Sequence, residues 1–171
     1  MLSQQSDVEF SLEWLSDDGR TYFVQHSSDL TNWNYFTTIR SGDGSMLSYD
    51  VYSSLEVLFL RLEWTDQEDQ GDPYAVDFDG DGLTTEQELN GNPQTSPLAW
   101  DTDGDGYNDQ WEINYGFDPT KSHSSGNAAH SADIEADTLN NILESLIGSN
   151  PNVGFEMLPV SSERHQIYTP H

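Results

Sequence analysis

A short segment of alternating aspartate and glycine occurs twice in the chain, and this repeat constrains the fold more than any other feature. Asp-Phe-Asp-Gly-Asp-Gly at residues 77–82 recurs as Asp-Thr-Asp-Gly-Asp-Gly at residues 101–106. A weaker third copy, Asp-Ile-Glu-Ala-Asp-Thr, occupies residues 133–138. Three carboxylates placed so closely repel one another unless a cation lies between them. The repeat therefore predicts a series of cation-binding loops.

The spacing of oxygen-bearing residues in the first two copies fits a 12-residue calcium loop. Such a loop supplies oxygen from positions 1, 3, 5, 7, 9 and 12, with glycine at position 6 for a sharp turn. Position 7 offers its backbone carbonyl, and position 12 is a glutamate. Mg²⁺ is less suited, because it keeps a tight octahedral shell with several waters. The predicted ligands are Asp77, Asp79, Asp81, Leu83, Thr85 and Glu88 in loop 77–88, and Asp101, Asp103, Asp105, Tyr107, Asp109 and Glu112 in loop 101–112.

The third loop, residues 133–144, departs from this pattern at two positions. Glu135 is longer than the aspartate of the other loops, and Thr138 stands where glycine is needed. A β-branched residue resists the positive φ of that turn. Two readings stay open: the loop binds calcium with weaker or altered geometry, or it keeps only the shape of a loop. Its predicted ligands are Asp133, Glu135, Asp137, Leu139, Asn141 and Glu144.

The chain divides near residue 65, where its composition changes. Residues 1–65 hold 10 acidic and 3 basic residues and are rich in aromatic and β-branched side chains. Residues 66–152 hold 19 acidic residues against 1 basic residue. The tail, residues 153–171, either returns as a strand to the first part or begins a neighbouring module.

The first part has the alternation typical of strands with one buried face. A strand is predicted from Val8 to Trp14, and a turn at residues 17–19 leads into a second strand from Thr21. Further strands are expected over residues 34–39, before Val51, and over residues 55–64. The last of these is apolar on both faces, so something must cover its second side. We therefore expect five short antiparallel strands in a small sandwich or half-barrel.

In the second part each loop leads into a short helix. The helices are expected to end near Gly91, Gly116 and Gly148, and a proline follows each of these glycines within three residues. The predicted fold class is a mostly β module followed by calcium-bound loop–short-helix repeats, α+β overall.

The charge and the motifs exclude several classes of function. A formal net charge of −26 repels nucleic acid and anionic membranes. No apolar run is long enough for membrane insertion. The common motifs for a serine nucleophile, a phosphate loop or a zinc protease do not occur, and 13 of the 19 acidic residues in the second part fall on predicted ligand positions. We therefore do not expect an enzyme.

The loops resemble a known family of repeats. Asp-x-Asp-Gly-Asp-Gly loops followed by a short helix and by Gly-Phe-Asp-Pro (116–119) or Gly-Ser-Asn-Pro (148–151) are similar to bacterial thrombospondin type-3-like repeats. The resemblance covers about residues 72–152, and the first repeat departs from it at Asn-Gly-Asn-Pro (90–93). It implies calcium-loaded spacers, stalks or adhesive segments in secreted or cell-surface proteins. Residues 19–33 also resemble small β modules of large secreted bacterial proteins.

Together these observations predict a calcium-binding structural or adhesive module of a secreted or cell-surface bacterial protein, with calcium stabilising the fold. Extracellular calcium modules have Kd values of roughly 10⁻⁴–10⁻³ M, so cytosolic calcium would leave such sites empty. Besides calcium, another protein or a glycan at the cell surface is a candidate partner.

Two alternatives stay open. One is a dockerin-like docking module, which also pairs calcium loops with helices. The other is carbohydrate binding through the β part, with Trp14, Trp33, Tyr35 or Trp64 as stacking platforms. An EF-hand sensor is disfavoured because prolines just before the first two loops prevent an entering helix.

Overall fold

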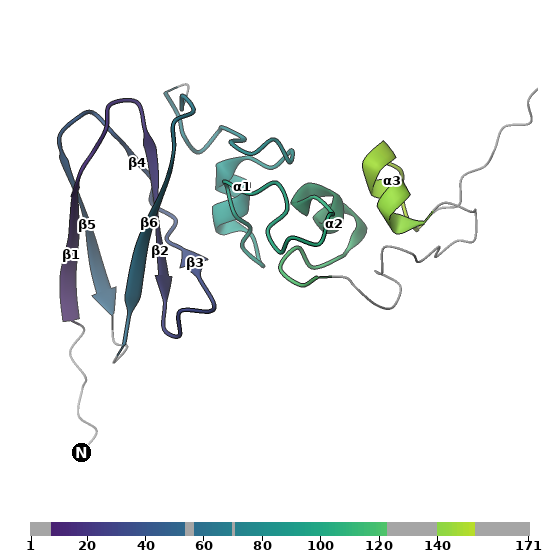
Figure 1. Cartoon of the computed structure of the whole chain (residues 1–171), viewed down its shortest axis with the longest axis horizontal. Coiled ribbons are helices and arrows are strands. Elements are labelled where there is room, and N and C mark those ends of the chain that lie inside the picture. Colours follow the sequence, from purple (N-terminus) through teal and green to yellow (C-terminus); the bar gives the residue numbers. More distant parts are fainter. Residues whose placement is uncertain (1–7, 54–56, 70, 123–139, 153–171) are drawn as a thin grey trace, which may run out of the picture.

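The computed structural model describes residues 8–53, 57–69, 71–122 and 140–152, which form a β part followed by three short helices along the long axis (Figure 1). The structure is mostly β with a few short helices, as the sequence predicted. No helix in these described ranges is long and apolar enough to cross a membrane. The elements are β1 (Val8–Leu15), β2 (Thr21–Ser27), β3 (Asn34–Tyr35), β4 (Arg40–Ser41), β5 (Met46–Ser53), β6 (Phe59–Thr65), α1 (Thr85–Asn90), α2 (Asp109–Tyr115) and α3 (Asn141–Ile147).

The strands form two antiparallel sheets. β1 pairs with β5 from Val8↔Ser53 to Leu15↔Met46. In the second sheet β2 pairs with β3, β4 and β6, and its register with β6 runs from Thr21↔Thr65 to Ser27↔Phe59. The predicted turn at residues 17–19 therefore joins strands of different sheets, and β1 and β2 do not form a hairpin.

An apolar cluster lies between the two sheets and explains why β1 pairs with β5 and not with β2. Val24 of β2 and Tyr49 and Val51 of β5 are buried together. Burying one face of each sheet against the other removes apolar surface from water, which a single two-stranded hairpin cannot do. The β part is thus a small sandwich. Partly buried residues that complete the cluster are Leu12, Trp14, Phe36, Leu58, Leu60 and Leu62.

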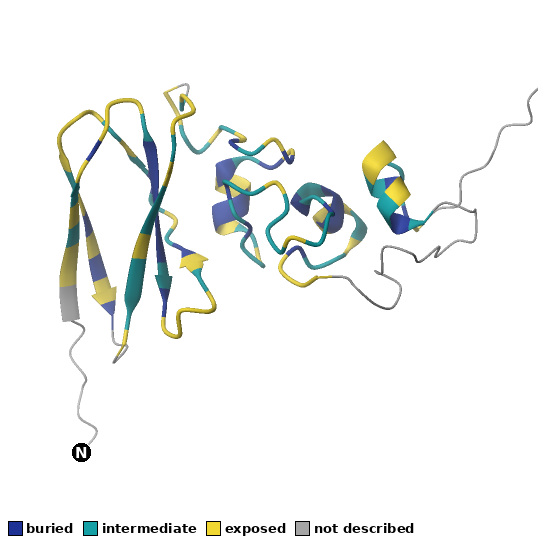
Figure 2. Cartoon of the chain, viewed as in Figure 1, coloured by how far each residue is buried: buried dark blue, intermediate teal, exposed yellow. Residues whose placement is uncertain are grey.

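The strand buried on both faces is β2, whereas the sequence predicted the segment 55–64. Six of the seven β2 residues are buried (Figure 2). β6 has no fully buried residue, and Trp64 on it is 51% exposed. The reason is position: β2 lies at the centre of its sheet and β6 pairs only with β2.

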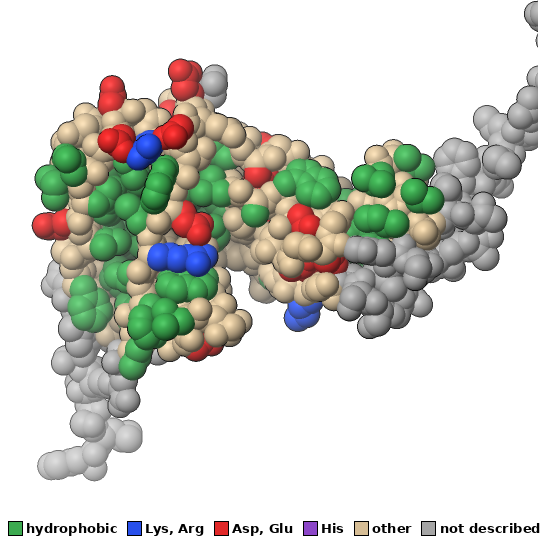
Figure 3. Space-filling view, in the orientation of Figure 1, with side chains coloured by type: hydrophobic (Ala, Val, Ile, Leu, Met, Phe, Trp, Pro, Cys, Tyr) green, Lys and Arg blue, Asp and Glu red, His purple; other side chains and the backbone are tan. Residues whose placement is uncertain are grey.

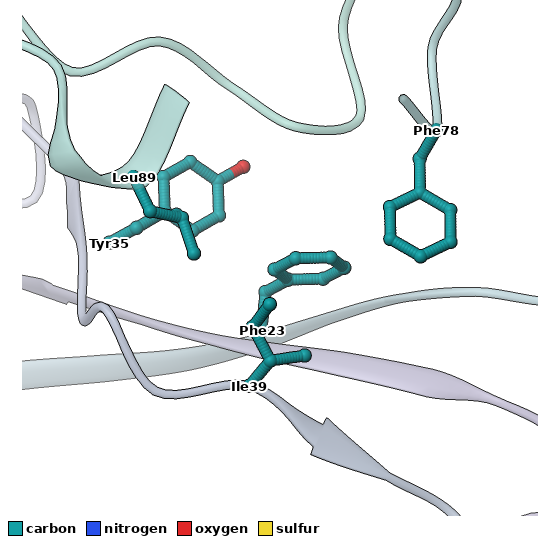
Figure 4. Close-up of a cluster of buried hydrophobic side chains, with 5 residues drawn as sticks. All are labelled: Phe23, Tyr35, Ile39, Phe78 and Leu89. Carbon is teal, nitrogen blue, oxygen red and sulfur yellow. The ribbon is translucent and has the colours of Figure 1, made fainter. Parts of the chain in front are cut away.

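A second apolar cluster joins the sheet to the first repeat (Figure 4). Phe23 of β2 is 1% exposed and lies edge-on to Phe78 of the first loop, with ring centroids 5.9 Å apart. Leu89 of α1 is buried in the same cluster, together with Tyr35 and Ile39. The first repeat therefore covers the outer face of the sheet.

Only part of the strand that was expected over residues 34–39 forms: β3 covers Asn34–Tyr35, and β4 begins just beyond the expected range, at Arg40. The backbone N–H of Tyr35 donates to the side chain of Gln94 (2.9 Å), and the N–H of Ile39 donates to the Tyr74 hydroxyl (3.2 Å). Because both N–H groups donate to side chains of the second part, pairing with β2 over this stretch is limited to the short strands β3 and β4. The described residues consequently contain six strands where five were expected.

The helices end at the three glycines that the sequence indicated. The residue at loop position 8 is the N-cap in each repeat, and its side chain accepts a hydrogen bond from the third helical N–H: Thr84, Asn108 and Asn140. Gly116 and Gly148 end α2 and α3 in the left-handed conformation. Gly91 ends α1 with extended backbone instead (φ −64°). Since each helix has only six or seven residues, packing and caps must hold it.

Candidate metal centre

The first two loops have the same internal hydrogen bonds, one repeat apart. The carboxylate of Asp77 accepts from the N–H of Gly80 (2.7 Å) and Gly82 (3.0 Å). Asp101 accepts in the same way from Gly104 (2.8 Å) and Gly106 (2.6 Å). Further along, Asp79 and Asp103 each accept from the N–H two residues on (3.1 Å in both), and Asp81 (2.6 Å) and Asp105 (3.1 Å) do the same. These hydrogen bonds curve the backbone of each loop around its three aspartate carboxylates.

Glycine at position 6 is required by this turn. Gly82 has φ +102° and Gly106 has φ +99°, a region that residues with a Cβ rarely adopt. At Gly82 a Cβ would also lie 2.4 Å from the side chain of Gln110, at the start of the next helix. The glycine therefore serves both the turn and the contact between repeats.

The aspartates of each loop come close enough to share one cation. Carboxylate oxygens of Asp77, Asp79 and Asp81 lie within 4.8 Å of one another, and so do those of Asp101, Asp103 and Asp105. On the face shown in Figure 3, acidic side chains gather over the segment around α2. Burial and the neighbouring carboxylates Asp81 and Asp77 raise the pKa of Asp79 to about 6, although a backbone hydrogen bond opposes this shift.

The glutamate at position 12 is buried in all three repeats. Glu88, Glu112 and Glu144 are 1%, 0% and 1% exposed. Burial, followed by repulsion from Asp79 and Asp81, raises the pKa of Glu88 to about 9. Burial, followed by Asp105 and Asp103, raises the pKa of Glu112 to about 9 as well. Glu88 and Glu112 therefore face the aspartates of their own loops from the helices that follow.

The donors of the first loop fit a calcium ion. Both oxygens of Glu88, and one oxygen each of Asp79 and Asp81, are buried without a hydrogen-bond partner among the described residues. Leaving a buried carboxylate uncompensated is costly. A hard divalent cation would compensate several such oxygens at once, and calcium accepts six to eight of them.

The residues at position 7 turn their side chains inward. Leu83 is 7% exposed, and Tyr107 is fully buried. The Tyr107 ring stacks on Trp111 of α2 with centroids 4.8 Å apart, and Trp111 stacks on Phe117. The indole N–H of Trp111 donates to the carbonyl of Ser149 (3.2 Å), which connects the second repeat to α3.

The residues at position 9 lie differently from the other predicted ligands. The hydroxyl of Thr85 donates to the carbonyl of Val76 (2.8 Å), the residue just before its loop. Asp109 is grouped with Asp81 and Glu88 of the first loop, with carboxylate oxygens within 4.8 Å of one another. Spacing along one loop gave no signal for this placement.

Four of the six predicted ligands of the third loop, Asp133, Glu135, Asp137 and Leu139, lie outside the described residues. Asn141 and Glu144 lie on α3, and both are buried. The tail, residues 153–171, also lies outside the described residues.

A polar cleft of about 940 Å³ lies beside the candidate loops, lined by β-part residues such as Trp33 and Arg61 and by Gln94 and Thr102 of the second part. The guanidinium of Arg61 lies 4.4 Å from the Trp33 ring centroid, and that of Arg20 lies 5.5 Å from the Trp64 ring. An arginine thus occupies one face of each tryptophan. Of the other two aromatic residues considered as sugar platforms, Trp14 packs in the sandwich core and Tyr35 is buried.

Residues 101–122 match the family model of the bacterial TSP3 repeat. The match begins at the first aspartate of the second loop and includes α2, in agreement with the resemblance seen in the sequence. Repeats of this family bind calcium as structural elements, occur in extracellular proteins and are not an enzyme family. Comparison with curated proteins and with solved structures gave no match.

Proposed function

We propose that this chain is a calcium-binding structural module, not an enzyme, in which Ca²⁺ stabilises the packing of the repeats on the β part. The observation that carries this proposal is Glu88, whose two buried oxygens have no protein partner within the described residues and face Asp79 and Asp81. One cation at this place would remove the repulsion between the loop carboxylates and connect α1 to the loop before it. The two proposed sites lie in loops 77–88 and 101–112, and each is formed by the three aspartates of the loop and the glutamate at position 12.

The location of the protein follows from the same chemistry. With few apolar residues in each repeat, folding must depend on cation occupancy, and weak sites fill only at millimolar calcium. Extracellular fluid provides that concentration, which supports a secreted or cell-surface bacterial protein. In that setting the repeats serve as a spacer or adhesive segment, with a protein or a glycan as partner. The dockerin-like alternative stays a prediction.

Calorimetric titration of the EDTA-treated protein with Ca²⁺, followed in parallel by circular dichroism, tests this function. We expect at least two binding events accompanied by a gain of helical signal. A variant with Asp77→Asn and Asp79→Asn should lose one event. A control with Asp18→Asn and Asp50→Asn, two exposed residues of the β part, removes the same charge and should lose none. No binding at millimolar calcium would contradict the proposal.

A further inference from the structure

Asp109 is the one carboxylate of the second loop that the structure groups with the first. Its oxygen lies within 4.8 Å of oxygens of Asp81 and Glu88, and it is fully buried. Burial is the main cause of the raised pKa of Asp109, and Asp81 and Asp79 of the first loop add to it. Asp109 in turn adds to the raised pKa of Glu88 in the first loop and of Glu112 in its own loop. The charges that raise the pKa of Asp109 most are therefore those of the first loop.

Several hydrogen bonds hold Asp109 in this place. The N–H and the hydroxyl of Thr102 donate to its two oxygens (2.9 and 2.6 Å). On either side of it in the chain, Asn108 donates to the carbonyl of Asp81 (3.1 Å) and Gln110 donates to the carbonyl of Gly82 (2.6 Å). The first turn of α2 is thus fastened to the backbone of the first loop. A carboxylate has about four lone-pair positions, so Asp109 keeps acceptor capacity for a cation.

Glu88 is the independent sign of a ligand at this point. It is 1% exposed, and neither of its oxygens has a hydrogen-bond partner among the described residues. The unsatisfied oxygen of Asp81 lies in the same group. Only a cation, or protons, can compensate three buried carboxylates that converge in this way.

In the third repeat, too, the residue at position 9 contacts the preceding repeat. Asn141 hydrogen-bonds through its side chain to Tyr107, at position 7 of the second loop. Thr85 has no calcium loop before it, only the β part, and its hydroxyl donates to a backbone carbonyl instead. Position 9 of the second and third repeats therefore contacts the repeat before it.

We propose that Asp109 is a ligand of the first calcium site, together with Asp77, Asp79, Asp81 and Glu88, and does not serve the loop in which it is encoded. The inference rests on the proposed function and adds that calcium binding at the first site is coupled to the packing of α2. The first site is complete only when α2 has formed against the first loop, so calcium in that site fastens two neighbouring repeats. The repeats then gain stability as a stack and not as independent units.

Two glycine amides provide a reporter for each site. The N–H of Gly82 donates to the first aspartate of loop one, and that of Gly106 to the first aspartate of loop two. Calcium titration of the ¹⁵N-labelled chain, read at these two amides, gives two separate midpoints. For Asp109→Asn we expect the Gly82 midpoint to rise by roughly tenfold, because ligand charge sets affinity, and the Gly106 midpoint to change less than about threefold. The matched variant Asp105→Asn should do the reverse.

A second variant keeps the inference testable if Asp109→Asn fails to fold. Thr102→Val keeps every carboxylate and removes the hydroxyl that orients Asp109 and that also accepts from the N–H of Ser96. The Gly82 midpoint should again rise more than that of Gly106. A selective or equal rise at Gly106 in both variants would overturn the inference while leaving the proposed function intact. If neither glycine of the unsubstituted protein responds to calcium, the proposed function fails and the inference fails with it.

Discussion

The β part and the repeats of this chain bury different kinds of groups. The β part encloses Val24, Tyr49 and Val51 between two sheets, and two of its arginines, Arg20 and Arg61, pair with acids of the same part. The repeats also bury apolar side chains such as Leu89 and Tyr107, but they bury glutamates against aspartates as well. Residues 66–152 contain a single basic residue. A core of the first kind is stable in water by itself, whereas a core of the second kind needs a cation from solution. The supply of positive charge therefore distinguishes the two regions more clearly than their secondary structure does.

The largest expected effect comes from the apolar contact that joins the regions. Phe23→Ala should lower the free energy of unfolding by about 3–5 kcal/mol, because it leaves a cavity against Phe78 and Leu89. The loss should be larger in calcium than in EDTA, because Phe78 and Leu89 belong to the first loop and α1, whose packing depends on the cation. Chemical denaturation in both buffers measures it, with Leu15→Ala, at a site 70% exposed, as the control. An equal loss in both buffers would mean that the first repeat packs on the sheet without the cation.

Removing ligands from the second loop should give a loss of stability that depends almost entirely on calcium. The double variant Asp101→Ala and Asp105→Ala should lose about 2.7 kcal/mol at calcium one hundred times above Kd, and almost nothing in EDTA. Thermal unfolding in the two buffers provides the comparison, with Asp18→Ala and Asp50→Ala as the control for charge. Equal losses in both buffers would contradict the role of these aspartates as ligands.

The calcium-free protein should respond to pH in a way that distinguishes the regions further. The folded state raises the pKa of Glu88 and Glu112 to about 9 from an ordinary value of 4.5, so folding takes up protons. The stability that protonation provides is fully present below about pH 4.5 and is lost as pH rises through about 9. In EDTA the melting temperature should therefore fall from pH 5 to pH 9. Glu88→Gln should flatten this slope, and an unchanged slope would refute the assignment.

A smaller effect is expected at the cap between the repeats. The Asn108 side chain accepts from the N–H of Trp111 (2.6 Å) and donates to the carbonyl of Asp81 (3.1 Å). Asn108→Ala should cost about 1 kcal/mol or somewhat more. Asn108→Asp keeps the cap and removes the donor, so its loss in thermal unfolding should be smaller. If both variants lose the same amount, the cap alone matters at this position.

The loops and helix ends were predictable because their causes are local. Position 6 glycines such as Gly106 and caps such as Gly116 are dictated by the backbone within a few residues. The N-cap role of Thr84 had a sequence signal as well, since Gln87 completes a capping box three residues later.

Strand partners and the placement of Asp109 were not predictable in the same way, because distant residues decide them. Apolar alternation shows that β1 has a buried face but does not show that β5 is its partner. The hydrogen bonds that Gln94 and Tyr74 make to residues 35 and 39 come from the far side of the sequence break near residue 65. Asp109 belongs to the second loop by spacing, and only the contact of Asn108 and Gln110 with the first loop moves it toward the first site.

Hydrogen–deuterium exchange of the intact chain, with calcium and after EDTA, tests the central claim most directly. We predict that amides of α1, α2 and the two loops exchange much faster once calcium is removed, while the amides that pair β2 with β6 keep their protection. Protection that is independent of calcium in both regions would contradict the account, because the carboxylate core would then be stable without a cation.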